Sequence, residues 1–339
     1  MTRVLVTGAS GFVGSNLVEA LVTRGAEVTC LVRTTSKLQR LRRWPVRLLF
    51  GDVTDQASLH AAVAGQDVVY HVAGRTKVVR AAHFYEVNAG GTRNVARICA
   101  EQPKPPVLVL VSSMAAAGSP SEHGLRSAAD FAMPVSHYGR SKRLAERSVR
   151  RVALRVPVSI VRPAIVLGIA DVEGWKMFRA VDRLGLHLVP GLAPYRYAFI
   201  DGRDLAEVLI GAAERGRRIG PSETDAETAS QGVYYAASPE QITYADLGKM
   251  VADAVGRRRV RIVPVPMPLV WLIAAGVELT AQVARRPMFL MIDKVRDIAA
   301  DSWTCSVEAT ASELGITVTT PLAERLRQTA QWYRQAGWL

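Results

Sequence analysis

Short apolar runs alternate with helical patterns of apolar and polar residues through the first 170 positions of the 339-residue chain. The runs DVVYHVA (67–73) and VLVLV (107–111) are apolar at almost every position, which is typical of parallel strands buried on both faces. Strands alternating with helices predict an α/β fold with a doubly wound parallel sheet. The predicted strands are residues 3–7, 27–32, 46–51, 67–72, 107–112 and 158–161, and the predicted helices are 12–23, 57–63, 92–101 and 138–152.

The pattern becomes less regular after Gly168. We predict a Gly/Pro-rich loop over LVPGLAPYRY (188–197) and an exposed polar loop at 223–230. The remaining apolar periodicity predicts one strand at 260–263 and helices at 172–184, 244–255, 269–284, 288–299, 307–314 and 322–335.

A glycine-rich segment, TGASGFVG (7–14), lies between the first predicted strand and the first predicted helix. Gly8 allows a sharp turn, Gly11 lets backbone N–H groups approach a pyrophosphate, and Gly14 allows the helix to pack closely on the strand. The positive end of the helix dipole then faces the phosphates. We therefore predict a Rossmann-type dinucleotide-binding domain over 1–170, to which part of 198–237 returns. Residues 171–339 are predicted to form a smaller, mainly helical and partly discontinuous substrate lobe.

Basic residues follow the second predicted strand, where NAD sites usually carry an acid that binds the ribose 2′-hydroxyl. Arg33 is placed to meet a 2′-phosphate, with Lys37 or Arg40 in support, so NADP is the predicted cofactor. NAD is the alternative, because Arg33 can also stack on adenine. Asp52, which follows the third strand, can accept a hydrogen bond from the adenine amino group or cap the strand end.

Tyr138 and Lys142 occur in the segment HYGRSK, four residues apart in a predicted helix, and so share one face of it. A neighbouring ammonium group stabilises a phenolate, which allows a tyrosine to act as a general acid or base. Ser112 and Ser113 end the fifth predicted strand and supply hydroxyl groups beside the same cleft.

Eight segments occur in an order that resembles the extended branch of the short-chain dehydrogenase/reductase superfamily: TGASGFVG, GDVTD, HVAG, VNAGGTRNV, VSSMAAAG, YGRSK, RPAIVLG and FIDGRDLA. The resemblance covers essentially the whole chain. It implies that Ser113, rather than Ser112, forms a catalytic triad with Tyr138 and Lys142, and that Asn88 is mainly structural. It also implies a homodimer, paired through the helices at 138–152 and 92–101.

Within this branch the chain is most similar to the dihydroflavonol reductase and 3β-hydroxysteroid dehydrogenase-like group, on the segments VPGLAPYRYAFIDGRDLAE and GVYYAASPEQITYADL. The sugar-nucleotide epimerases and dehydratases share the front half, but they usually carry Asp and Tyr where this chain has Val32 and Ala117. HVAG also departs from the usual pattern, because Gly74 stands where the family more often has Ala.

The predicted site residues fall into three sets, and no metal site is predicted because the six histidines show no H-x-x-H or H-E-x-x-H spacing. The catalytic set is Ser113, Tyr138 and Lys142. The cofactor set is Gly8, Gly11, Phe12, Val13, Gly14, Arg33, Lys37, Asp52, Val53, Val72, Ala73, Gly74, Tyr138, Lys142, Pro163 and Val166. The substrate set is Thr76, Ser113, Met114, His187 and Tyr195. His71 is predicted to be a structural hydrogen bonder and His137 to face solvent.

The predicted function is NAD(P)-dependent hydride transfer between the nicotinamide and a ketone or secondary alcohol on a bulky, apolar small-molecule substrate. A nucleotide-sugar epimerase that holds its NAD permanently is the alternative. A third hypothesis is a regulator that binds NADP without turnover, although such proteins typically lose the Tyr or the Lys.

The net charge of +13 does not change this picture, because the 43 basic residues are scattered and lack interleaved aromatic residues; we expect no nucleic-acid partner. Three widely spaced cysteines are typical of a reducing compartment, so we expect a cytoplasmic protein.

The longest uncharged stretch, 262–277, is predicted not to span a membrane, because three prolines interrupt it and Glu278 ends it. Leu269, Leu272 and Ile273 begin an apolar stripe at helical spacing, which most often packs on its own domain. Arg285 and Arg286 follow the stripe, and this order suits a helix lying on an anionic lipid surface. Peripheral contact with the cytoplasmic face of a membrane is therefore a further expectation.

Overall fold

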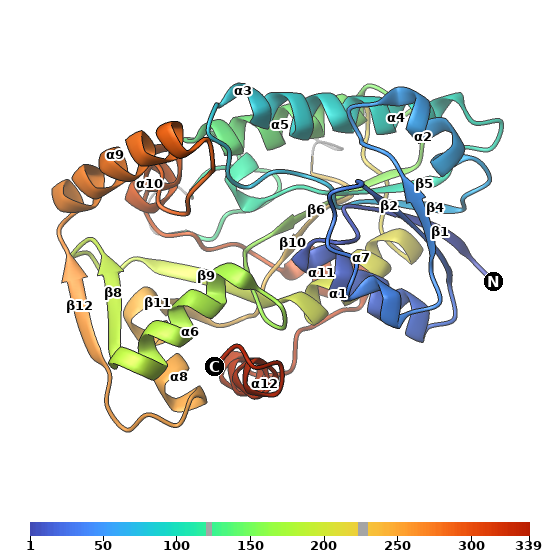
Figure 1. The fold of residues 1–339 in the computed structure, drawn as a ribbon. Coiled ribbons are helices and arrows are strands. Elements are labelled where there is room, and N and C mark those ends of the chain that lie inside the picture. Colours follow the sequence, from blue (N-terminus) through green and yellow to red (C-terminus); the bar gives the residue numbers. More distant parts are fainter. Residues whose placement is uncertain (120–123, 223–229) are drawn as a thin grey trace.

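The computed structural model describes residues 1–119, 124–222 and 230–339. A seven-stranded sheet lies at its centre, in the order β10-β6-β5-β4-β1-β2-β3, and neighbouring strands run parallel (Figure 1). Its strands are β1 (Arg3–Thr7), β2 (Glu27–Val32), β3 (Arg47–Phe50), β4 (Val68–His71), β5 (Val107–Val111), β6 (Val158–Pro163) and β10 (Val233–Ala236). The predicted Rossmann-type α/β fold is confirmed.

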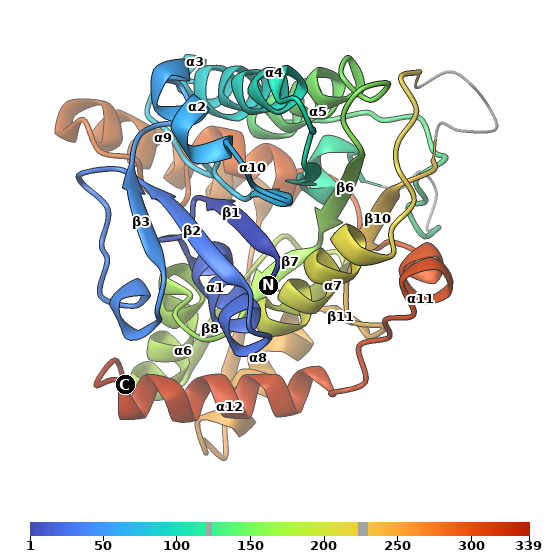
Figure 2. The same ribbon diagram turned by 90° about the vertical axis from the view of Figure 1, so that its right-hand side faces the viewer.

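Helices cover both faces of this sheet, because successive residues of each strand point to opposite sides. In β1, Val4 and Val6 join the apolar core under α1 and α7 (Gly202–Glu214), whereas Leu5 joins the core under α2, α4 and α5 (Figure 2). The helices of the first 150 residues are α1 (Phe12–Thr23), α2 (Gln56–Val63), α3 (Ala82–Phe84), α4 (Thr92–Glu101) and α5 (His137–Arg150), with single-turn or irregular segments η1 (Leu41–Arg43), η2 (Tyr85–Gly91) and η3 (Met114–Ala116).

The predicted bounds of β1, β2, α1 and α4 agree with the structure at both ends. Helix α5 begins one residue earlier than predicted, because the Ser136 hydroxyl caps it by accepting a hydrogen bond from the Gly139 N–H (2.9 Å).

The strand order reverses between β1 and β4, which is where open α/β sheets form a ligand-binding crevice beyond the carboxyl ends of the strands. The glycine-rich segment follows β1, HVAG includes the end of β4, and Ser113 lies two residues after the last residue of β5. The topology therefore brings these three segments to one edge of the sheet.

The remaining chain forms the lobe and two small sheets, ordered β11-β9-β7 and β12-β8. The predicted loop at 188–197 is wrong at both ends: residues 188–190 belong to β8 and 196–197 to β9, since β8 pairs with β12 and β9 pairs with β7 and β11. Most of the predicted loop at 223–230 lies outside the described residues. The elements are β7 (Ile165–Leu167), α6 (Val172–Leu184), β8 (Leu186–Pro190), β9 (Arg196–Asp201), α7 (Gly202–Glu214), β11 (Gln241–Thr243), α8 (Tyr244–Ala254), β12 (Arg261–Val265), α9 (Met267–Ala284), α10 (Ile292–Ala299), α11 (Glu308–Leu314) and α12 (Leu322–Gln335).

The three prolines of the apolar stretch 262–277 do not interrupt helix α9, contrary to the prediction. Pro264 lies in β12 and Pro266 immediately precedes the helix, while Pro268 occupies its first turn, where proline is tolerated. The helix is therefore unbroken for 18 residues, with a mean hydropathy of 1.5, and by length and composition it could cross a membrane. Val270, Ala274 and Ala281 are buried on it, but Leu269, Leu272 and Ile273 are exposed, so the predicted stripe does not pack on the domain.

His71 joins three elements beneath the crevice. Its Nδ1 is hydrogen bonded to the Thr7 hydroxyl of β1 (2.7 Å), and its Nε2 to the Thr92 hydroxyl of α4 (2.9 Å). Burial, with a smaller contribution from the charge of Lys142, lowers the pKa of His71 to about 3. The imidazole is therefore neutral in the folded protein, and its predicted structural role is confirmed.

The buried imidazole predicts a loss of stability in acid. Below its ordinary pKa of 6.5, His71 takes up a proton in the unfolded chain but stays neutral in the folded protein until about pH 3. Its contribution is therefore complete above pH 6.5 and is lost towards pH 3, by about 1.4 kcal/mol per pH unit. Denaturant unfolding on both sides of pH 6.5 should show a weaker acid dependence for His71→Gln than for the wild type. Equal slopes would contradict this account.

Candidate active site

The turn between β1 and α1 needs glycine at two positions. Gly8 has a φ of +71°, and a Cβ there would lie 2.6 Å from the backbone nitrogen of Ala73. A Cβ on Gly14 would collide with the carbonyl oxygen of Gly8. Gly11 is exposed and caps α1 without a side-chain hydrogen bond, so the cap residue leaves the first-turn N–H groups of α1 open to a ligand. This backbone cradle fits the pyrophosphate of a dinucleotide.

The adenosine end of the predicted cofactor site is defined by residues after β2 and β3. Arg33 and Lys37 are exposed, as a phosphate contact requires, whereas Arg40 donates to the Ser15 hydroxyl (2.6 Å) and pairs with Glu19 (3.5 Å). Arg40 is thus already engaged with α1. Asp52 accepts hydrogen bonds from the backbone and hydroxyl of Thr54, both on Oδ1.

The three predicted catalytic residues come together at the carboxyl edge of the sheet. Ser113 caps η3 by accepting from the Ala115 N–H (3.1 Å), and it is hydrogen bonded to the Tyr138 side chain. Lys142 donates from Nζ to the carbonyl oxygen of Val111 (2.7 Å). A Cβ on Gly74 would lie only 3.5 Å from this Nζ, so the backbone of HVAG passes directly beside the ammonium group.

Burial shifts the two titratable members of the triad in opposite senses. It raises the pKa of Tyr138 to about 12, against the hydrogen bond with Ser113 that lowers it and together with the charge of Asp297 that raises it further. It lowers the pKa of Lys142 to about 8, against the nearby Glu146 carboxylate. At neutral pH Tyr138 is therefore a protonated phenol that can donate its proton, beside an ammonium group.

A buried ion pair behind the triad was not predicted from the sequence. Glu146 accepts two hydrogen bonds from Arg162 of β6 (2.8 Å each), one from Arg143 (2.9 Å) and one from the Ser112 hydroxyl (2.6 Å). Burial alone would raise the pKa of Glu146, but the Arg162 guanidinium lowers it to about 2. Since Ser112 is engaged with Glu146, Ser113 is the serine that faces Tyr138. The spacing of Glu146, four residues after Lys142 on the same helix face, is a signal that could have identified it.

Asn88 has the mainly structural role that was predicted for it. Its side chain accepts from the Arg75 N–H (2.7 Å) and donates to the Arg75 carbonyl (3.0 Å) and to the Ser141 hydroxyl (2.9 Å). It thereby joins the segment after β4 to α5. His137 was wrongly predicted to face solvent: it is half-buried and its Nδ1 is hydrogen bonded to the Tyr85 hydroxyl (2.9 Å).

The predicted substrate residues are not all brought to the triad. Met114 is buried in an apolar cluster against which Tyr138 and Tyr197 pack, and Thr76 is exposed two residues after Gly74. His187 does not lie in an open loop: it is buried in β8, bonded through Nε2 to the Tyr244 carbonyl (2.9 Å), and its ring stacks near that of Tyr244. Tyr195 is half-buried in the short loop before β9.

The other predicted cofactor residues lie along the same sheet edge. Val72 and Ala73 follow β4, Val53 is buried after β3 and accepts from Asn94 (3.0 Å), Pro163 ends β6, and Val166 lies in β7. Among residues 1–119, 124–222 and 230–339, no group of three or more His, Cys, Asp or Glu side chains could hold a metal ion.

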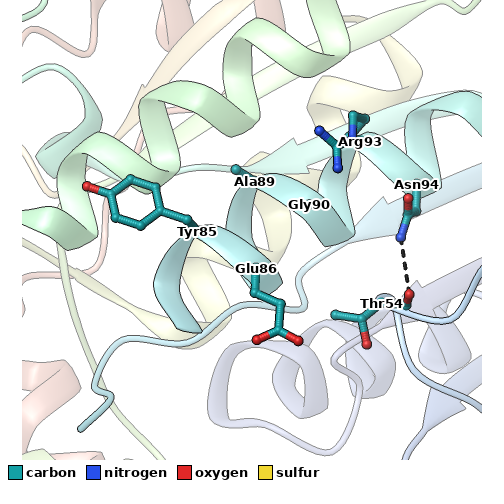
Figure 3. A pocket seen from close by; sticks show the side chains of 7 residues that line it. All are labelled: Thr54, Tyr85, Glu86, Ala89, Gly90, Arg93 and Asn94. Atoms are coloured by element: carbon teal, nitrogen blue, oxygen red, sulfur yellow. Dashed lines mark hydrogen bonds between the residues drawn. The ribbon is translucent and has the colours of Figure 1, made fainter. Parts of the chain in front are cut away.

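A surface pocket of about 400 Å³ lies elsewhere, along the outer side of η2 and the start of α4. Its lining residues are Thr54, Tyr85, Glu86, Ala89, Gly90, Arg93 and Asn94. Figure 3 shows the Tyr85 side chain pointing away from Glu86 and Thr54, while Asn94 bonds the Thr54 backbone. None of the predicted catalytic residues lines this pocket, so it is separate from the triad.

Comparison with known proteins agrees with this geometry. Residues 4–224 match the sequence model of the family described as "NAD dependent epimerase/dehydratase family". The chain is 29% identical to a ceramide reductase of Caulobacter vibrioides over 99% of this chain and 96% of that protein. It is 36% identical to human 3 beta-hydroxysteroid dehydrogenase type 7, over 54% of each chain.

A solved structure shares the fold at lower identity. The Thermus thermophilus UDP-glucose 4-epimerase complex with NAD has a TM-score of 0.77 and 21% identity, covering 99% of this chain and 100% of that one. The predicted resemblance to the extended short-chain dehydrogenases/reductases is thus confirmed. This chain belongs to the NAD-dependent epimerase/dehydratase family and is an NAD(P)-dependent enzyme of the extended short-chain dehydrogenase/reductase type.

Proposed function

We propose that this enzyme uses NADPH to reduce a ketone on a bulky, apolar lipid, of the long-chain or steroid-like kind. The observation that carries the proposal is the half-buried phenol of Tyr138, hydrogen bonded to Ser113 and packed against the apolar cluster that contains Met114 and Trp303. An apolar wall beside the proton donor suits a substrate whose carbonyl is flanked by hydrocarbon. The names of the ceramide and steroid relatives support the same substrate class.

Each residue of the triad has a distinct part in this reaction. When bound, the nicotinamide supplies the hydride. Tyr138 donates its proton to the carbonyl oxygen of the substrate as negative charge develops there, and Ser113 orients that oxygen by a hydrogen bond. Lys142 keeps a positive charge on the same helix face as the phenol, which favours release of the proton.

The nucleotide-sugar epimerase is the alternative function, because it would use the same triad and structures of that class share the fold. Val32 and Ala117, which stand where those enzymes usually carry Asp and Tyr, favour the reductase. A regulator that binds NADP without turnover is disfavoured by the intact pair of Tyr138 and Lys142.

NADP as the cofactor, the homodimer and the cytoplasmic location belong to the same proposal. The exposed Arg33 supports a 2′-phosphate contact. Helices α4 and α5 lie together at one surface (Figure 1), and the exposed side chains of α5 include Leu144 and Arg147, which a partner subunit would cover. Light scattering at micromolar concentration measures the oligomeric state. The three buried, unpaired cysteines suit a reducing compartment.

Helix α9 supports contact with a membrane surface. One face packs on α10 through Val270 and Ala274, while the other exposes Leu272 (70%), Leu279 (65%) and Val283 (80%). Arg285 and Arg286 follow at the exposed end of the helix. A helix held on one side by protein and apolar on the other, with cations at its end, fits an anionic lipid surface on which it lies flat.

Replacing the proton donor tests the proposed reaction. Tyr138→Phe should lower turnover of an apolar ketone by about 10²–10⁴, because general acid catalysis is lost. The affinity for NADPH should stay within about twofold, since Tyr138 loses only its hydroxyl while Lys142 and the glycine loop, which belong to the same predicted cofactor set, are untouched. Turnover is followed by NADPH absorbance and affinity by calorimetry. Wild-type turnover confined to nucleotide sugars, on copurified NAD, would establish the alternative.

Arg33→Asp tests the cofactor. Repulsion should replace a charge-assisted contact with the 2′-phosphate, so NADPH binding should weaken roughly 10²-fold while NADH binding changes little. Calorimetric titration of both cofactors measures this. Arg42→Asp, at an exposed position in η1, is the control for the change in net charge. Tighter binding of NADH than of NADPH by the wild type would contradict the proposal.

The double variant Leu272→Glu/Leu279→Glu tests the membrane surface. Loss of two apolar side chains should weaken binding to vesicles of phosphatidylglycerol at least roughly 10²-fold, at about 1.5–3 kcal/mol for each side chain. Flotation with these vesicles and with phosphatidylcholine measures the binding. Leu154→Glu, at a leucine that is 88% exposed outside α9, is the matched control. If the wild type binds neither vesicle and α9 instead mediates self-association that the double variant abolishes, a second copy covers the helix and the membrane proposal is wrong.

A further inference from the structure

The first turn of the catalytic helix α5 is held by a carboxylate from the far end of the chain. The His137 N–H donates to Oδ1 of Asp293 in α10 (2.7 Å), and the Tyr138 N–H donates to Oδ2 of the same side chain (3.0 Å). These two amides have no acceptor within their own helix. Asp293 also places a negative charge at the positive end of the α5 dipole.

A second acid, Asp297, lies one turn further along α10 and contacts the same region. The Ser136 hydroxyl accepts from the Gly139 N–H and is hydrogen bonded to the Asp297 carboxylate. Asp297 is only 8% exposed, and its Oδ1 has no hydrogen-bond partner among the described residues. Its charge also acts on the Tyr138 side chain. The amides of residues 137, 138 and 139 are therefore all held, directly or through Ser136, by α10.

Helix α10 is itself fixed in place. Its first amide, at Ile292, donates to Oε2 of Glu278 in α9 (3.0 Å), and Val295 is buried against Val270 and Ala274. The Trp303 indole donates to the Asp297 carbonyl (2.8 Å). Figure 1 shows α9 and α10 side by side, near the start of α5. The two acids therefore project from a rigid element and not from a loop.

We propose that Asp293 and Asp297 are positioning residues for Tyr138: α10 clamps the first turn of α5 so that the phenol meets Ser113 and the substrate oxygen. A misplacement of about 1 Å at a reacting group can cost about 10² in rate, and Tyr138 is the second residue of its helix, where ends fray most easily. The inference rests on the proposed function only for the identity of the substrate.

Substitution of Asp293 by the isosteric amide tests the clamp. An asparagine has one acceptor oxygen where the carboxylate has two, so one of the two backbone N–H groups would face an amide donor. Asp293→Asn should lower kcat about tenfold, with KM and NADPH affinity within twofold of wild type. The control is Asp67→Asn. This carboxylate also accepts a hydrogen bond from a backbone amide, the Arg3 N–H (2.8 Å), but it lies before β4, at the amino ends of the strands and away from the triad.

Asp297→Asn tests the effect of the Asp297 charge on the pKa of Tyr138. A purely structural role of Asp297 would leave this pKa unchanged. The groups that act on the pKa of Tyr138 are the Ser113 hydroxyl after β5 and the Asp297 carboxylate of α10. Lys142 lies four residues further along α5, and the uncharged ring of Phe84 packs on the Tyr138 ring. Removing the Asp297 charge favours the phenolate and so lowers the pKa of Tyr138. The Tyr138 phenolate should therefore form at lower pH in Asp297→Asn than in the wild type, and at an unshifted pH in Asp67→Asn. Alkaline titration of the phenolate absorbance measures this separately from the loss of the Lys142 charge near pH 8, and Tyr138→Phe identifies the Tyr138 signal.

The outcomes separate this inference from the proposed function. If the wild type reduces no apolar ketone but acts on a nucleotide sugar, the proposed function fails, and the same variants are assayed on that sugar because both reactions use Tyr138. If no substrate is turned over, hydrogen exchange of the amides at 137–139 decides, with about a tenfold increase expected in Asp293→Asn alone. Wild-type kcat and exchange in Asp293→Asn, or an equal loss of kcat in Asp67→Asn, would overturn the inference.

Discussion

The catalytic arrangement depends first on the buried pair of Glu146 and Arg162. Two charges without access to water are tolerated only when each is fully hydrogen bonded, and removal of one partner of such a pair typically costs about 3–5 kcal/mol. Here the pair joins α5 to β6 and, through Ser112, to β5. It therefore sets the distance and rotation of α5 against the sheet. Once α5 is fixed, Lys142 reaches the Val111 carbonyl and Tyr138 meets Ser113.

Burial also shifts the pKa values of the two titratable residues of the triad. Desolvation penalises the phenolate of Tyr138 and the ammonium of Lys142, so the pKa of the first rises to about 12 and that of the second falls to about 8. At neutral pH Tyr138 is therefore a protonated phenol. The negative charges near the site act in different places: Glu146 supports the ammonium, whereas Asp297 supports the neutral phenol. Tyr138 and Lys142 therefore each have their own neighbouring carboxylate.

The Rossmann sheet and the C-terminal lobe differ in how much of their apolar surface is buried. The parallel sheet buries both faces under helices, so the apolar residues of its strands are almost completely covered. The lobe buries Phe178, Leu247 and Tyr333 in one core but leaves most of α9 exposed. Contiguous exposed apolar surface on a folded protein usually marks an interaction site. Because α10 connects this surface to the first turn of α5, the exposed helix and the proton donor belong to one continuous packing unit.

The sequence by itself determined the Rossmann sheet, the glycine cradle and the pairing of Tyr138 with Lys142, because these depend on local features: strand and helix periodicity, backbone space and i, i+4 spacing. The choice of Ser113 over Ser112 came from the resemblance to the family. The sequence did not determine what covers each side chain. Burial of His187 in β8 depends on the pairing of β8 with β12, and the partners of Glu146 and Asp293 lie 16 and 156 positions away along the chain. The exposure of Leu272 on α9 likewise depends on which distant segments pack on that helix. Only the tertiary structure decides these, since an apolar or acidic side chain has the same local pattern whether it is covered by protein, by a partner or by water.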